Sequence, residues 1–131
     1  MRYLMDTHTL LWFLEDDQKL SKYAETEIAD PANQIFVSDI TFFEMAIKIA
    51  LNKLQIARPL AEFIDQTISE DFQILPICHA HIVAYQDVTF HAMHRDPFDR
   101  MLIAAALHEG LDIITLDEKF GKCQDVVRIV W

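Results

Sequence analysis

The sequence predicts an α/β fold, a three-layer α/β/α sandwich with a mostly parallel central sheet. Two observations support this prediction. Short apolar runs typical of buried strands alternate with longer stretches typical of helices. No low-complexity segment, internal repeat or Gly/Ser-rich linker interrupts the chain, so residues 1–131 are expected to form a single domain.

The expected elements follow one another with short connections. Strands are expected at Arg2–Met5, Gln34–Val37, Phe72–Leu75, Asp112–Thr115 and Val126–Val130. Helices are expected at Thr9–Glu15, Ser21–Ala29, Ile40–Leu54, Pro59–Glu70, His79–Gln86 and Pro97–Glu109. Ser21 suits an N-cap, Pro31 stops the helix before it, and Pro59 suits a first helical turn. Gly110 is expected to end the last helix as a left-handed cap.

Composition and charge narrow the function. Hydrophobic residues make up 52% of the 131 residues and charged residues 24%, which is typical of a globular protein. The 11 Lys and Arg against 21 Asp and Glu give a net charge of −10, which argues against nucleic-acid binding through bulk positive charge. The net charge is compatible with an enzyme whose carboxylates hold a metal. The two glycines, Gly110 and Gly121, exclude a Gly-rich phosphate loop.

Cysteine usage and the N-terminus predict a cytoplasmic protein with no membrane segment. Cys78 and Cys123 allow at most one disulfide, and neither belongs to a C-x-x-C pair. The chain reaches Asp6 before a long apolar region develops, and the apolar run Leu10–Leu14 is too short for a signal-peptide core.

Acidic side chains follow three of the expected strands. Asp6 comes directly after the first strand, Ser38 and Asp39 end the second, and Asp117 follows the fourth. The carboxyl ends of parallel strands form the ligand-binding edge of an α/β sheet. Each acid alone is explained by helix N-capping. Together they predict a cluster of oxygen ligands at one edge.

Glu44 breaks an apolar pattern on its helix. Ile40, Phe43, Ile47 and Leu51 trace an apolar stripe at i, i+3, i+7 and i+11, and Glu44 occupies the i+4 position of that stripe. We therefore expect this carboxylate to face the interior of the protein.

Asp99 presents the same anomaly, because it shares a helix face with Leu102 and Ile103. A carboxylate that faces an apolar interior must be neutralised, paired or bound to a cation. An ion pair with Lys48 or Arg100 is the purely structural explanation. The coincidence with acids at the strand ends favours a metal site.

The type of metal follows from the ligands. Ligation by carboxylates alone suits Mg²⁺ or Mn²⁺. Asp96 precedes Pro97 and suits an N-cap, and a secondary role at the metal stays open for it. The alternative is a zinc site among the cysteine and histidines of the runs 78–81 and 91–94, but their spacing matches no established zinc pattern.

The remaining conspicuous side chains have simpler explanations. The aromatic residues Trp12, Phe13, Phe42 and Phe43 are expected in the core. The basic residues expected to contact phosphates locally are Lys48, Lys53, Arg95 and Arg100.

The chain resembles the PIN-domain ribonucleases, specifically the VapC-like toxins of VapBC-type toxin–antitoxin pairs. The matching segments are Leu4-Met5-Asp6-Thr7-His8, Val37-Ser38 with Phe43-Glu44-Met45, the run from His94 through Asp96-Pro97-Phe98-Asp99-Arg100 to Ala104, and Thr115 with Asp117. Their order and spacing span nearly the entire chain, and the Asp-Pro-Phe-Asp-Arg run is the most specific.

This resemblance implies a function and a set of site residues. It makes Asp6, Glu44 and Asp99 the central metal-binding and catalytic acids, Asp117 the fourth acid, and Asp96 part of the subgroup's signature. It implies Mg²⁺- or Mn²⁺-dependent hydrolysis of RNA, a cognate antitoxin as a protein partner, and a homodimer.

The alternative from another class is a catalytically silent PIN-like module that only binds proteins. Two other classes are excluded by particular residues. A receiver-like signalling module needs an Asp after the third strand, where the chain reads Leu75-Pro76-Ile77-Cys78. An aspartyl-phosphate phosphatase needs an Asp where His8 stands.

Overall fold

The computed structural model describes residues 1–88, 96–116, 120 and 127–131. Within these ranges five strands form one sheet in the order β3-β2-β1-β4-β5, and all neighbouring strands run parallel. The strands are β1 (Arg2–Met5), β2 (Gln34–Ser38), β3 (Gln73–Leu75), β4 (Asp112–Ile114) and β5 (Ile129–Val130). The predicted parallel sheet is confirmed.

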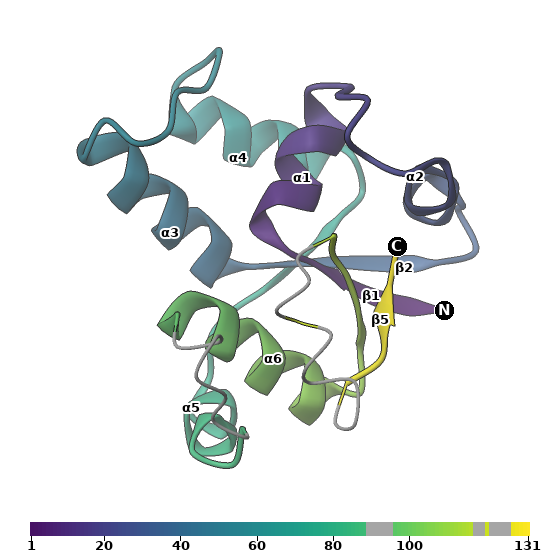
Figure 1. Ribbon diagram of the computed structural model, residues 1–131, viewed down its shortest axis with the longest axis vertical. Coiled ribbons are helices and arrows are strands. Elements are labelled where there is room, and N and C mark those ends of the chain that lie inside the picture. Colours follow the sequence, from purple (N-terminus) through teal and green to yellow (C-terminus); the bar gives the residue numbers. More distant parts are fainter. Residues whose placement is uncertain (89–95, 117–119, 121–126) are drawn as a thin grey trace.

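The helices form layers on both faces of the sheet, as predicted. In Figure 1, α1 (Thr7–Leu14), α2 (Lys22–Ala29) and α4 (Leu60–Ser69) lie on one side, and α5 (His79–Tyr85) and α6 (Pro97–Glu109) lie on the other. The remaining helix, α3 (Asp39–Ala50), follows β2 directly and contacts α1, α4 and α6. None of the helices in the described ranges is long and apolar enough to cross a bilayer.

Two apolar cores fill the spaces between the three layers. On one face Met5 and Val37 of the sheet pack with side chains such as Leu10 and Phe63. On the other face Leu4 and Ile113 pack with α6 and the buried Phe120; the α6 side chains of this core are Leu102, Ile103, Ala104 and Ala106. Successive strand residues point to opposite faces. The central residues of the longer strands are therefore apolar on both faces, and the polar residues Arg2, Gln34, Gln73 and Asp112 stand at strand starts.

The strand order places a topological switch point between β1 and β4. From β1 the chain proceeds through β2 and β3 toward one edge of the sheet, whereas β4 and β5 lie on the other side of β1. Met5 is in register with both Val37 and Ile114, so the three strands end at the same level. Ligands of open α/β sheets bind beyond the carboxyl ends of the strands at this point.

Local signals predict several helix ends correctly. The Ser21 hydroxyl accepts from the Ala24 N–H at 3.0 Å. Gly110 ends α6 with a φ of 68°. One end was misjudged: α3 stops at Ala50 instead of Leu54, and the Lys53 and Leu54 N–H groups both donate to the Lys48 carbonyl in the following turn.

The predicted apolar stripe of α3 is wrong at two positions. Phe43 and Leu51 are 57% and 58% exposed, and Phe43 lies edge-on to Phe98 with the ring centroids 6.0 Å apart. The buried face of the helix includes polar Thr41 and Glu44. Apolar periodicity therefore misidentified the buried face, although it placed Glu44 in the interior correctly.

We predict that Gly110→Ala destabilises the protein by about 1 kcal/mol, because only glycine adopts this left-handed conformation without cost. An added Cβ meets nothing within 4 Å, so the penalty comes from the backbone alone. Urea denaturation measures the free energy of unfolding. Gly110→Asn is the control, with a smaller loss, and equal stability of the alanine variant and the wild type would contradict the explanation.

Candidate active site

Asp6 lies at the switch point, directly after β1. It caps α1: its Oδ1 accepts from the Thr9 N–H at 2.8 Å. Its Oδ2 accepts from the hydroxyl of Thr115, which follows β4. The carboxylate is 5% exposed and is thus held by hydrogen bonds from both sides of the switch point.

Glu44 is the second buried carboxylate, 4% exposed. The Thr7 hydroxyl donates to its Oε1 at 2.7 Å, and Lys48 Nζ lies 2.7 Å from its Oε2, one helical turn further along α3. Thr7 and Thr41 hydroxyl oxygens are 3.4 Å apart. Because Thr7 follows Asp6 in the chain, this hydrogen bond ties Glu44 to the residue next to Asp6 at the start of α1.

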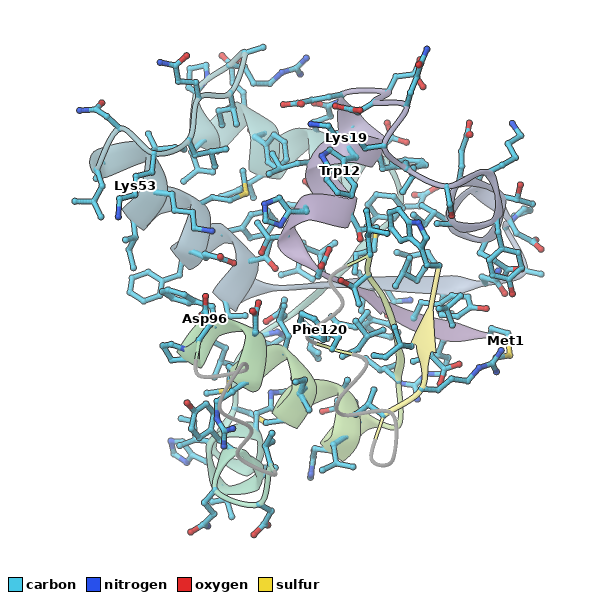
Figure 2. All side chains as sticks on the ribbon, in the orientation of Figure 1. Met1, Trp12, Lys19, Lys53, Asp96 and Phe120 are labelled. Carbon is cyan, nitrogen blue, oxygen red and sulfur yellow. The ribbon has the colours of Figure 1, made fainter. Side chains whose placement is uncertain are left out.

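The start of α6 brings two more acids toward this cluster. Asp96 is the N-cap, and its Oδ1 accepts from the Phe98 N–H at 2.8 Å, which confirms the predicted capping role. Asp99 lies half-buried in the first turn. Figure 2 shows Asp96 at the N-terminal end of α6, which faces the beginning of α3.

The pKa of Lys48 is affected by the nearby acids. Burial alone would lower the pKa of its ammonium group. The hydrogen bond to Glu44 and the negative charges of Glu44, Asp96 and Asp99 outweigh burial and raise this pKa. The ion pair that the sequence left open as a structural explanation is therefore present for Glu44.

The ionised form of Asp6 is disfavoured by its surroundings. Burial raises the pKa of this carboxyl, against the opposing hydrogen bonds from Thr115 and Thr9. A cation at this carboxylate would offset the cost of burying its charge.

A cavity of about 250 Å³ opens beside Asp6. It is lined by Asp6, His8, Trp12 and Leu116. One of the buried acids therefore borders space that a ligand can enter.

The other residues predicted from the sequence to contribute to the site or the core lie in several different environments. Asp117, His91, His94, Arg95 and Cys123 lie outside the described residues. Arg100 is buried, donates from Nη2 to the Val88 carbonyl at 2.8 Å and lies over the Tyr85 ring, which does not fit the predicted phosphate contact. Of the aromatic residues expected in the core, Phe42 is buried, Trp12 and Phe13 are half-buried, and Phe43 is exposed.

Two of the residues considered for a zinc site, Cys78 and His81, lie near Glu109. Cys78, His81 and Glu109 have potential ligand atoms within 4.8 Å of one another at the α5–α6 contact. His81 Nε2 lies 2.8 Å from Glu109 Oε1, and this hydrogen bond lowers the pKa of the Glu109 carboxyl. The buried histidine is thus satisfied by a carboxylate.

Sequence reasoning missed the hydroxyl groups that orient the acids. Thr7 and Thr41 were not singled out, although both contact the Glu44 region. A usable signal was present: Thr7 directly follows a strand-ending acid, and Thr41 precedes Glu44 by one helical turn. Thr9 carries a third hydroxyl, which donates to the Ile114 carbonyl at 2.9 Å and ties α1 to β4.

The fold and the site define an α/β domain with an acidic cluster at the switch point of a parallel sheet. The family model of the PIN domain matches residues 3–125. The chain therefore belongs to the PIN domain family.

Known proteins resemble this chain along nearly its whole length. Ribonuclease VapC22 of Mycobacterium tuberculosis is 29% identical over 119 residues, which cover 88% of this chain and 87% of that protein. VapBC2 of Rickettsia felis bound to a promoter DNA fragment matches at a TM-score of 0.71 and 16% identity, over 99% of this chain and 98% of that one. FitAcB of Neisseria gonorrhoeae matches at a TM-score of 0.68 and 20% identity, over 98% and 96%. The structural matches support the fold.

We predict that Asp6→Asn stabilises the metal-free protein at neutral pH. Because the folded protein raises the pKa of Asp6 above its ordinary value of 3.8, the contribution of this carboxyl to stability is largest in acid and falls as the pH rises through the folded-state pKa. Each tenfold difference in proton affinity corresponds to about 1.4 kcal/mol. Asparagine keeps the cap to Thr9 and carries no charge.

Urea denaturation in EDTA across pH 4 to 7 measures this effect as a difference between the variant and the wild type. The stability advantage of the variant should grow with pH and then level off. A difference that does not change with pH would contradict the proposed cost of burying the Asp6 charge.

Proposed function

We propose that this protein is a divalent-metal-dependent ribonuclease and the toxin of a toxin–antitoxin pair. The observation that carries the proposal is the presence of two buried carboxylates at the switch point of a PIN-domain sheet: Asp6 directly after β1, and Glu44, which accepts from the hydroxyl of the neighbouring Thr7. Burying carboxylates is costly unless a cation compensates them. The name of the relative, Ribonuclease VapC22, supports RNA as the substrate.

The donor set fits Mg²⁺ or Mn²⁺. Asp6, Glu44 and Asp99 offer carboxylate oxygens, which these hard cations prefer, and Asp117 is the proposed fourth acid. An ionised carboxylate has about four acceptor positions. The hydrogen bonds at Asp6 and Glu44 therefore leave capacity for a metal. Asp96 caps α6, and its proposed role is to hold the first turn that carries Asp99.

Several residues of the chain have separate roles in the proposed hydrolysis of a phosphodiester. When bound, a divalent cation supplies an activated water and stabilises the charge on the scissile phosphate. Thr115 and the Thr9 N–H orient the Asp6 carboxylate, and Thr7 orients Glu44. The N-termini of α1 and α6 add positive partial charge at the edge where a phosphate would bind.

Lys48 holds Glu44 in the metal-free arrangement. Its ammonium lies 2.7 Å from Oε2, and the pKa of Lys48 is raised by Glu44, Asp96 and Asp99 against the effect of burial. We propose that Lys48 partly neutralises the acids until a divalent cation binds.

The proposed partners follow from the relatives. VapBC-5 of Mycobacterium tuberculosis, which matches at a TM-score of 0.58 and 15% identity, is described as a member of the VapBC family of toxin-antitoxin systems, and this supports a cognate antitoxin as the partner of this chain. A homodimer and a cytoplasmic location belong to the same proposal.

The second candidate is a catalytically silent PIN-like module that binds proteins. The ion pair between Lys48 and Glu44 favours it, since an internal cation lets the fold satisfy Glu44 without a metal. The two candidates differ in two measurable properties, the affinity for divalent cations and the cleavage of RNA.

We predict that Mn²⁺ binds the purified wild-type protein and that Asp99→Asn weakens binding by at least about tenfold, as loss of a ligand should. Isothermal titration calorimetry on antitoxin-free protein measures the affinity without a known RNA target. The same substitution should abolish RNA cleavage. Its melting temperature in EDTA should stay close to that of the wild type because Asp99 is only half-buried.

Asp65→Asn is the matched control, because Asp65 is an exposed acid on α4, away from the cluster. It should bind Mn²⁺ like the wild type. No heat of binding to folded wild-type protein at millimolar Mn²⁺ would favour the silent module. Equal binding by Asp99→Asn would remove Asp99 from the site.

A further inference from the structure

We infer that the cavity between His8, Trp12 and Leu116 is a stacking subsite for an unpaired nucleobase of the RNA. This inference rests on the proposed ribonuclease function and adds to it the way in which an acidic protein holds its substrate. The cavity has a volume of about 250 Å³, and the fourth residue in its lining is Asp6. A base in this cavity would lie next to the proposed site of cleavage.

The geometry of α1 builds the aromatic wall. His8 and Trp12 are four residues apart and therefore share one face of the helix. Their ring centroids are 5.8 Å apart, with the planes inclined by 40°. Leu116 follows β4 and contributes an apolar side chain that is 49% exposed. The cavity thus lies between α1 and the segment after β4.

Trp12 is held in place before any ligand arrives. Trp131 meets its indole edge-on, with the centroids 5.9 Å apart and the planes at 71°. Lys19 Nζ lies 5.9 Å from the centroid of the same ring, and Figure 2 shows the two side chains close together at the end of α1. A fixed aromatic ring loses little conformational freedom on stacking. The Lys19 ammonium places positive charge beside the proposed base.

Charge explains why a base is the favoured occupant. The chain carries a net charge of −10, and the acids at the site repel phosphates. Two basic residues near the acids are already engaged, since Lys48 pairs with Glu44 and the buried Arg100 donates to the Val88 carbonyl. A nucleobase is flat and uncharged and has π faces that stack on aromatic side chains. Stacking therefore supplies affinity that electrostatics at this edge cannot.

The test uses two single-stranded hexamers in EDTA, so that no cleavage occurs. One is oligoadenylate, and the other is an abasic ribose-phosphate hexamer of the same charge. Quenching of Trp12 fluorescence in a Trp131→Phe background measures binding. We expect quenching by the oligoadenylate and at least fivefold weaker binding of the abasic hexamer. Aromatic-to-alanine changes at stacking sites weaken binding by roughly 5- to 150-fold.

Substitutions distinguish stacking on an aromatic ring from contact with any apolar side chain of similar size. In anisotropy titrations with labelled oligoadenylate, Trp12→Leu should weaken binding at least fivefold, whereas Trp12→Phe should retain most of it. His8→Ala tests the same wall at an exposed residue whose loss leaves the core intact. Tyr23→Leu on α2 is the control and should bind like the wild type. The part of the affinity lost in Trp12→Leu should change little between roughly 50 and 200 mM salt, because it involves no counterion release.

Each outcome separates this inference from the proposed function. Equal binding of the two hexamers, or unchanged binding in Trp12→Leu and His8→Ala, would overturn the subsite. If Mn²⁺ still bound in an Asp99-dependent way, the ribonuclease proposal would stand without it. If Trp12→Leu lost a copurifying protein partner but bound oligoadenylate normally, the cavity would belong to that partner. Trp12→Leu should bind Mn²⁺ like the wild type, since Trp12 is no metal ligand.

Discussion

The burial of Asp6 and Glu44 at one edge of the sheet is the constraint on which the rest of the site depends. Two carboxylates, each about 5% exposed or less, must be satisfied away from water. The chain meets this demand with hydroxyl groups from Thr7 and Thr115 and with the ammonium of Lys48. Burial raises the pKa of Asp6 despite the hydrogen bonds from Thr115 and Thr9, so these bonds compensate its buried charge only in part. The remaining cost is what a divalent cation would offset.

The fold explains why the acids come together. β1 lies between β2 and β4, so the chain segments that follow all three strands emerge at one edge. α1 starts at that edge with Asp6 as its cap, and α3 starts there after β2. α6 approaches from the opposite face and contacts α3, and its first turn contributes Asp99. Three separate parts of the sequence thereby bring acids toward one end of the sheet, and an aromatic cavity lies beside Asp6.

The sequence predicted most of the fold because its signals are local. Asp96-Pro97 and Gly110 mark both ends of α6 through capping chemistry, and the predicted helix matches the observed one. Apolar periodicity predicts the wrong position for Phe43 because the buried face of α3 includes polar Thr41 and Glu44. A pattern of apolar residues alone cannot indicate such a face. The pairing of Lys48 with Glu44 was foreseen only as one option, since choosing among partners depends on tertiary distances. The threonine contacts are indicated only by position, with Thr7 next to Asp6 and Thr41 one turn before Glu44, because a hydroxyl leaves no periodic signal.

Diffraction from a crystal soaked in Mn²⁺, recorded at the manganese absorption edge, shows whether the buried acids hold a divalent cation. We expect an anomalous peak about 2.1 Å from carboxylate oxygens of Asp6, Glu44 and Asp99, with the Lys48 ammonium moved away from Glu44. Hydroxyl contacts from Thr7 and Thr115 should persist, because they orient the ligands. A peak only at Cys78, His81 and Glu109, or an unchanged Lys48–Glu44 pair without a peak at the acids, would contradict it.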